Sequence, residues 1–306
     1  KFCTFFNVER DFEEMLSLVR NMTQADNQNE IQNQEIKEGP PSSQVEDETG
    51  RPLSPRVLGN ITRALQGADL TNMIRRQSIC SLIGDAAPQS LFSELFISID
   101  DVRNTLAPGV NLSVNKWLFN YLTETLDQCV LATLGKYTDL SSTGEISINL
   151  NVSTLLSPEF MQFDDNIIAS MRGSVIVELQ IVDIFSDLNA FIFARDFAKD
   201  RGYRICVDGL NHETISLVNR ERLGADLVKI LWDKNLLEVA RKKMMIGKIK
   251  SIGKSRVILC RCDHKEAVAH GHDIGISIFQ GRYIEDLITK EPRHRNRNTT
   301  RRNFQK

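Results

Sequence analysis

Short apolar runs that each end on a polar residue recur along the second half of this chain. Five of these runs end at Asn149, Glu178, Asp208, Lys229 and Gln280. Runs of four or five apolar and β-branched residues, separated by longer helical patterns, are typical of buried parallel strands in β–α units. Because parallel strands place their carboxyl ends on one side of a sheet, we expect these polar residues to face one site. That is the geometry at the mouth of a (β/α)8 barrel.

Eight strand candidates favour a closed TIM-like (β/α)8 barrel of the α/β class, and an open doubly wound sheet is the alternative. The candidates are Arg76–Leu82, Leu91–Ile97, Ile146–Leu150, Val175–Leu179, Tyr203–Val207, Leu227–Ile230, Val257–Cys260 and Ser277–Phe279. Helical patterns lie between several of them, at Asn115–Leu134, Leu188–Arg201, Ile215–Leu223, Lys234–Ile252 and His264–Gly271. In ARDFAKDRGYRICVD a helix ends in basic residues, Gly202 provides a left-handed cap, and a strand follows at once.

The composition suits one large globular domain with appendages. The 306 residues are 41% hydrophobic and 25% charged, with a net charge of −2. No apolar run approaches the roughly 18–20 residues that cross a bilayer, and no signal-peptide pattern is visible. We therefore expect a cytoplasmic protein. The chain begins at Lys1, so we expect a fragment or processed form, in which any membrane tether lies upstream.

The flanking segments differ from the barrel in composition. Residues 1–23 have helical spacing of apolar residues, and residues 24–55 form a polar, acidic stretch that predicts a disordered linker. The barrel is expected over residues 56–290, beginning with an amphipathic helix at Arg56–Asp69. Residues 291–306 form a basic tail, which predicts a disordered, solvated terminus, so no nucleic-acid partner is expected.

The six cysteines are scattered and show no CxxC spacing, which predicts buried free thiols in a reducing compartment. Cys260 and Cys262 lie near Asp263 and His264, a combination that could suggest a metal site. Alternate residues on a strand point to opposite faces, however, so the two thiols would not share one ion.

The order of these strand-end residues resembles that of the EAL-domain family, the cyclic di-GMP phosphodiesterases and their degenerate relatives. The resemblance covers roughly Ile74 to Leu287. The family's YQPI is similar to RQSI, which contains Gln77. Its Glu-Ala-Leu signature matches Glu94 and the two residues after it, although Ser98 stands where the family has arginine. Its VNLS and E-x-T-E motifs match the segments that contain Asn149 and Glu178.

The later motifs of the family are less complete in this chain. The family's DDFGTGYSSL aligns with DGLNHETISL, so Asp208 is kept and Gly209 replaces the second aspartate. Its KID aligns with Lys229 and the two residues after it. Its EGVE aligns with the four residues from Cys260 to Asp263, and its QGY aligns with the three residues that begin at Gln280.

The resemblance implies hydrolysis of cyclic di-GMP to linear pGpG with Mg²⁺ or Mn²⁺. It assigns four residues to one metal ion: Glu94, Asn149, Glu178 and Asp208. It assigns four residues to nucleotide binding: Gln77, Leu95, Lys229 and Gln280. Lys229 and Asp263 would be catalytic in an active enzyme. The second metal ion is expected to be lost, because Gly209 has no ligand atom and Asp263 is shorter than glutamate.

These losses favour a regulatory protein with a degenerate EAL barrel over an enzyme. We expect it to sense cyclic di-GMP or to bind an unidentified protein partner, with negligible turnover. Two alternatives remain open: a working metal-dependent phosphodiesterase, and a structural module that binds neither nucleotide nor metal. The missing arginine at Ser98 would weaken phosphate binding, since a charge-assisted contact contributes roughly 1.5–3 kcal/mol.

Overall fold

The computed structural model describes residues 50–67, 70, 73–84, 86–135, 144–216 and 218–290. The predicted helical segment at 1–23, most of the predicted linker and the basic tail at 291–306 lie outside the described residues. The described residues all belong to one compact unit. Within the described ranges, no helix has both the length and the apolar content needed to cross a membrane.

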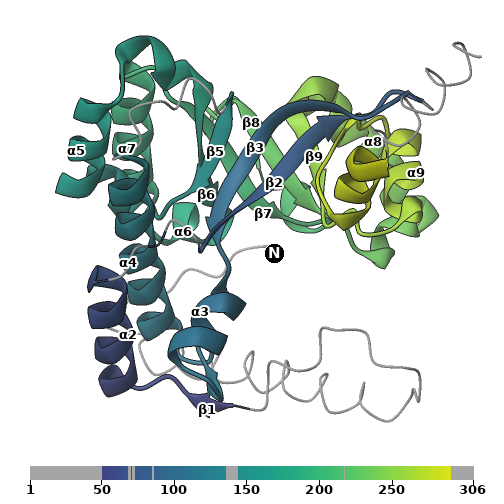
Figure 1. The fold of residues 1–306 in the computed structure, drawn as a ribbon. Coiled ribbons are helices and arrows are strands. Elements are labelled where there is room, and N and C mark those ends of the chain that lie inside the picture. Colours follow the sequence, from purple (N-terminus) through teal and green to yellow (C-terminus); the bar gives the residue numbers. More distant parts are fainter. Residues whose placement is uncertain are drawn as a thin grey trace, which may run out of the picture. The chain divides into compact units, whose positions relative to one another are not determined.

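Eight strands close into a barrel, as predicted, and the open-sheet alternative is wrong (Figure 1). The strands are β2 (Ile74–Ser81), β3 (Gln89–Ile97), β5 (Ile146–Asn149), β6 (Val175–Gln180), β7 (Arg204–Leu210), β8 (Leu227–Leu231), β9 (Val257–Cys260) and β10 (Ile278–Phe279). They follow one another around the barrel in the order β10-β2-β3-β5-β6-β7-β8-β9. All eight strands overlap the predicted ranges.

One strand differs from a regular (β/α)8 barrel. Strand β2 is antiparallel to both of its neighbours, β3 and β10. Only residues 82–88 connect β2 to β3, which is too short for the crossover that parallel strands need. The first two strands therefore form a hairpin. In this hairpin Gln77 pairs with Glu94, so the reversed strand still brings its predicted site residue to the level of the other strand ends.

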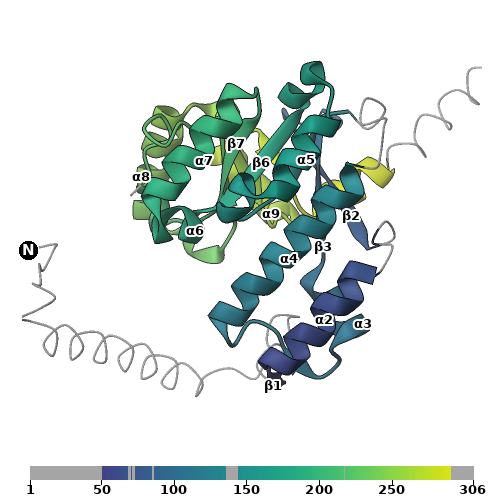
Figure 2. The ribbon, with the colours of Figure 1, turned by 90° about the vertical axis from the view of Figure 1, so that its left-hand side faces the viewer.

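Helices cover the outside of the barrel, as Figure 2 shows for α5, α6 and α7 in front of β6 and β7. Six α-helices of the described residues alternate with the strands from β5 onward or directly precede them. They are α4 (Lys116–Leu134), α5 (Pro158–Asn166), α6 (Ile181–Ser186), α7 (Leu188–Asp200), α8 (Val239–Ile252) and α9 (Lys265–Ile274). A further helix covers residues 282–290. Short 3-10 helices are η4 (Ser153–Leu156), η5 (Ala169–Ser174), η6 (Thr214–Ser216), η7 (Lys234–Leu237) and η8 (Lys254–Arg256).

The predicted helix at Ile215–Leu223 is wrong. Only η6 and turns occupy this region in the described residues. The side chain of Asn211 accepts hydrogen bonds from the backbone N–H groups of Glu213 and Thr214, at 2.9 and 2.8 Å. Bonds of this kind cap the first turn of a helix, and here the helical segment that follows is the single short turn η6, which ends at Ser216.

Two apolar layers hold the barrel together. The outer layer lies between the strands and the helices and includes Ile148, Val177, Phe160, Phe191 and Ile249. The inner layer fills the interior of the barrel and consists of Ile79, Phe92, Ile176, Cys206, Leu227, Ile258, Cys260 and Ile278. Because both faces of the strands are buried, their sequences are apolar runs rather than polar–apolar alternations. Cys80, Cys206, Cys260 and Cys262 are buried free thiols, as predicted for these four.

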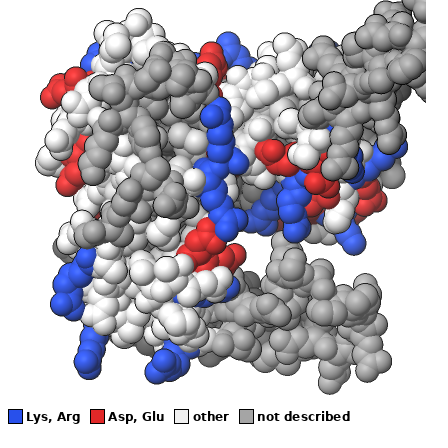
Figure 3. Space-filling model, in the orientation of Figure 1, with Lys and Arg blue, Asp and Glu red and all other residues white. Residues whose placement is uncertain are grey.

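A smaller apolar cluster lies beside the barrel. It joins α2 (Pro55–Gly67), α3 (Ile99–Leu106) and part of α4, and includes Leu58, Leu65, Val102 and Leu122. The short strand β1 (Arg51–Pro52) pairs in parallel with β4 (Val110–Asn111). The last residues of the predicted linker are therefore part of the folded unit. On the face drawn in Figure 3, a run of basic side chains adjoins a patch of acidic side chains.

A candidate ligand site at the barrel mouth

Strand alternation places a polar layer above the apolar interior of the barrel. On β6, Ile176 belongs to the inner apolar layer, and Glu178 follows two residues later on the same face. On β8, Leu227 and Lys229 have the same relation. The carboxyl ends of the parallel strands therefore carry their polar side chains inward at one end of the barrel, as the sequence predicted.

Lys229 lies at the centre of the polar layer, with only 2% of its surface exposed. Its Nζ atom lies 2.7 Å from Oε2 of Glu94 and 2.5 Å from Oε2 of Glu178. Glu178 is also almost fully buried. The ammonium group therefore bridges two carboxylates that would otherwise repel each other in a poorly hydrated environment.

Lys229, Glu94 and Glu178 form a triad, and their protonation follows from burial and from the charges of the three groups. Burial opposes the charged form of Lys229, but Glu178 and Glu94 outweigh it and hold the pKa of the lysine well above its ordinary value. Burial raises the pKa of Glu178 to about 7, against the attraction of Lys229. Burial also opposes ionisation of Glu94, but Lys229 and neighbouring amides lower the pKa of this carboxyl. Glu94 is thus the charged partner of the lysine, and Glu178 can take up a proton near neutral pH.

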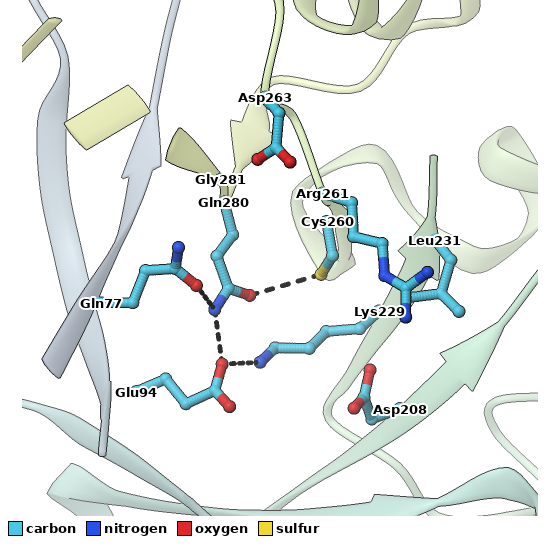
Figure 4. A pocket seen from close by; sticks show the side chains of 10 residues that line it. All are labelled: Gln77, Glu94, Asp208, Lys229, Leu231, Cys260, Arg261, Asp263, Gln280 and Gly281. Atoms are coloured by element: carbon cyan, nitrogen blue, oxygen red, sulfur yellow. Dashed lines mark hydrogen bonds and ion pairs between the residues drawn. The ribbon is translucent and has the colours of Figure 1, made fainter. Parts of the chain in front are cut away.

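Amide side chains complete the surroundings of Glu94 (Figure 4). Asn149 Nδ2 donates to Oε1 of Glu94 at 2.5 Å, and Gln280 Nε2 donates to its Oε2. Gln280 Nε2 also lies 2.9 Å from Oε1 of Gln77. One connected network therefore joins strands β2, β3, β5, β6, β8 and the end of β10. It contains the predicted site residues Gln77, Glu94, Asn149, Glu178, Lys229 and Gln280.

Asp208 and Gly209 lie at the end of β7. Oδ2 of Asp208 accepts a hydrogen bond from Gln180 Nε2 at 2.6 Å. Gly209 has a positive φ of 79°, a conformation that favours glycine. A Cβ atom added to Gly209 would lie 2.5 Å from Oε1 of Gln180. In this arrangement a side chain at position 209 would clash with the residue that holds Asp208.

Asp263 is held at the rim by Arg282. Its two carboxylate oxygens accept from the backbone N–H of Arg282 at 3.0 Å and from its guanidinium at 2.8 Å. Partial burial works against ionisation, but these contacts with Arg282 lower the pKa of Asp263 below its ordinary value. The carboxylate predicted to be catalytic in an active enzyme is therefore already engaged in an ion pair.

A pocket of about 260 Å³ opens at this end of the barrel. Its lining consists of Gln77, Glu94, Asp208, Lys229, Leu231, Cys260, Arg261, Asp263, Gln280 and Gly281. Small-molecule sites usually measure about 300–1,000 Å³. The pocket lies slightly below that range, so a dinucleotide would fill it only in part and extend onto the rim.

A divalent cation would need free oxygen atoms on the four predicted ligand residues. Oε1 of Glu178 is buried without a hydrogen-bond partner and could serve as a ligand atom. However, Lys229 occupies Oε2 of both Glu94 and Glu178, and Gln180 holds Asp208. Among the described residues, no group of three or more His, Cys, Asp or Glu side chains is arranged to hold a metal ion. The four predicted ligands thus do not form an ion site in this arrangement.

Leu95 does not belong to the pocket. It follows Glu94 on β3 and therefore points to the opposite face of the strand, where it packs against the outer apolar layer. Leu95 is thus placed away from the pocket lining, and its part in nucleotide binding stays a prediction. The sequence-based predictions missed the roles of Gln180 and Arg282, which hold Asp208 and Asp263, and the presence of Arg261 in the pocket. The sequence carries a signal for Arg261, since this residue stands where the EGVE motif has glycine.

The sequence matches no protein-family model and no curated protein. The structure is similar to the FimX EAL domain from Pseudomonas aeruginosa bound to cyclic di-GMP, with a TM-score of 0.55 and 17% identity, covering 74% of this chain and 94% of that one. It is also similar to the Xanthomonas citri FimX EAL domain in complex with cyclic di-GMP (TM-score 0.53, 9% identity, 74% and 91% covered). A third similar structure is Vibrio cholerae LapD, comprising its S helix, GGDEF and EAL parts and bound to cyclic di-GMP (TM-score 0.56, 15% identity). The match covers 74% of this chain and 57% of LapD.

Proposed function

With the fold of an EAL domain established, we propose that this chain is a cyclic di-GMP signalling protein whose barrel binds the dinucleotide without efficient hydrolysis. The proposal is supported mainly by positions 209 and 263, whose residues would have to bind a second metal ion. Gly209 has no side-chain ligand atom, and Asp263 is paired with Arg282. Two-metal hydrolysis needs both ions to stabilise the attacking and the leaving oxygen.

Binding of the dinucleotide requires polar contacts but not a second metal ion. Amide groups of Gln77 and Gln280 line the pocket and can pair with the polar edges of a base or ribose. Lys229 adds positive charge close to the pocket, although Glu94 and Glu178 neutralise much of it. The similar FimX and LapD structures contain bound cyclic di-GMP, which supports the choice of ligand.

An equilibrium titration with cyclic di-GMP tests this proposal. We expect binding by calorimetry both in EDTA and with Mn²⁺, with a similar dissociation constant in each. Gln77→Leu should weaken binding, because it removes an amide from the pocket. Gln89→Leu is the matched control, since Gln89 is an exposed glutamine at the other end of the adjacent strand β3. Absence of binding to the wild type at about 100 µM, an affinity near −5.5 kcal/mol, would refute the proposal.

A metal-dependent phosphodiesterase is the second candidate, and the buried, unpartnered Oε1 of Glu178 favours it. A cation that binds the folded state raises the melting temperature. If this candidate is right, millimolar Mn²⁺ should raise the melting temperature of the wild type but not of Glu178→Gln. The rise should be larger at pH 8 than at pH 6, because a proton on Glu178 competes with the ion. No rise at either pH would exclude the candidate.

We further infer that the barrel acts through a protein partner. Helices α6 and α7 expose large apolar side chains, including Val182 (75% exposed), Phe185 (52%) and Phe193 (65%). Clusters of exposed apolar residues often mark interaction surfaces. Phe193→Asp should weaken association with the partner or with a second copy, as measured by sedimentation. Trp117→Asp on α4 should not, although Trp117 is 88% exposed. Equal effects of both substitutions would argue against this surface.

A further inference from the structure

Arg261 has an unusual backbone conformation. Its φ is 59°, and among the described residues no other non-glycine residue has a positive φ. The left-handed region is unfavourable for residues with a Cβ atom, and bulky residues adopt it rarely. In the EAL-type motif the aligned residue is glycine, which adopts this conformation without strain. The chain thus keeps a glycine conformation but carries an arginine there.

The surrounding backbone holds Arg261 in this conformation. The N–H of Cys262 donates to the carbonyl of Gln280 at 2.9 Å, and the N–H of Asp263 donates to the carbonyl of Arg261 at 2.9 Å. Gly281 packs so closely that a Cβ atom on it would overlap the backbone of Cys262. Strained residues persist only where neighbours determine their conformation, and they cluster at functional sites.

The side chain of Arg261 is directed to the pocket. It is exposed, lines the pocket, and in Figure 4 extends from the segment after β9 to the side where Leu231 and Asp208 lie. Lys229, the other cation of the lining, is bound to two carboxylates. Across the described part of the chain, the Arg261 guanidinium has neither an ion pair nor a hydrogen bond. It is therefore the cation of the pocket that remains available to a ligand.

We propose that Arg261 is the phosphate-binding residue of this pocket. A guanidinium can bind a phosphodiester through two parallel hydrogen bonds, which a lysine cannot do. Arg261 would thereby replace the arginine that the EAL-type motif has at the position of Ser98. The hydroxyl of Ser98 instead caps helix α3 by accepting from the N–H of Asp101. The inference rests on the proposed function for the identity of the ligand, a cyclic dinucleotide. The anion site itself does not depend on that identity.

Arg261→Gly removes the side chain without disturbing the backbone, because glycine suits the observed conformation. We expect this variant to bind cyclic di-GMP about ten- to a hundredfold more weakly than the wild type, the loss expected for a charge-assisted contact. Its melting temperature should be equal or higher. Arg261→Lys should bind with intermediate affinity. Lys265→Gln is the control for charge alone, since Lys265 is exposed nearby at the start of α9 and does not line the pocket.

The outcomes distinguish this inference from the proposed function. Equal affinity of wild type and Arg261→Gly for cyclic di-GMP would refute the role of Arg261 and leave the receptor standing. An equal loss in Lys265→Gln would refute it as well, by showing a general charge effect. If the wild type does not bind the dinucleotide, inorganic phosphate becomes the probe. Stabilisation by phosphate in the wild type but not in Arg261→Gly supports the anion site, and no stabilisation in either refutes it.

Discussion

Lys229→Met tests whether the lysine holds the polar layer of the barrel together. The substitution keeps a side chain of similar length but removes the charge that bridges Glu94 and Glu178 at 2.7 and 2.5 Å. Removal of one partner from a buried ion pair typically costs about 3–5 kcal/mol, because it leaves an uncompensated charge. We expect Lys229→Met to lower the free energy of unfolding by a comparable amount.

The pH dependence of this loss follows from Glu94. Without the lysine, Glu94 must stay charged without a cation or take up a proton. Each pH unit above its ordinary pKa of 4.5 makes protonation about 1.4 kcal/mol more costly. The part of the destabilisation that comes from Glu94 is therefore limited to about 2 kcal/mol at pH 6 and about 5 kcal/mol at pH 8. The folded variant holds a proton more tightly than the unfolded chain, so its stability falls as pH rises above 4.5. In the wild type the lowered pKa of Glu94 removes this decline.

Urea unfolding at pH 6 and pH 8, followed by tryptophan fluorescence, measures the effect. Lys229→Met combined with Glu94→Gln should lose most of the pH dependence that Glu94 causes. Lys242→Met is the matched control, because Lys242 forms an exposed ion pair with Asp273 on neighbouring helices. It should leave the unfolding midpoint nearly unchanged at both pH values. A loss of less than about 1 kcal/mol for Lys229→Met at both pH values would refute the bridging role.

Two further predictions concern residues outside the triad. Burial raises the pKa of Asp127 to about 7 from its ordinary 3.8, so the folded state holds this proton more tightly than the unfolded chain. Wild-type stability should therefore fall as pH rises from about 4 to 7, and Asp127→Asn should reduce this slope in urea titrations. Gly209→Ala should lower stability by about 1–2 kcal/mol through its φ of 79°, whereas Gly59→Ala, in the open interior of α2, should raise the melting temperature. Equal shifts of the two glycine variants would contradict the strain argument.

The barrel and most of its polar layer could be predicted from the sequence because both follow from local patterns. Each apolar run predicts a strand buried on both faces. The polar residue that ends the run, such as Glu178 or Lys229, must then lie at the same end of the barrel as the others. The place of Gln77 was predicted by its motif alone. The register of the β2–β3 hairpin shows that it lies opposite Glu94.

The remaining features depend on contacts between distant segments. The reversal of β2 follows from a connection too short for a crossover, and an apolar run by itself does not indicate the direction of its strand. Helical spacing at Ile215–Leu223 was real, but the helical turn that Asn211 caps ends at Ser216, and residues 220–224 form turns. The pairing of Asp263 with Arg282, 19 residues later, and the left-handed backbone of Arg261 appear only once β9 and β10 are side by side.

Turnover of cyclic di-GMP tests the central claim most directly. The purified chain is incubated with the dinucleotide and Mn²⁺ under conditions in which binding is saturated, and linear pGpG is followed by chromatography. The account predicts that the bound dinucleotide stays intact, because Gly209 provides no ligand atom and Asp263 is bound by Arg282. Conversion at about one per second or faster, within the ordinary range of enzymes, would contradict it.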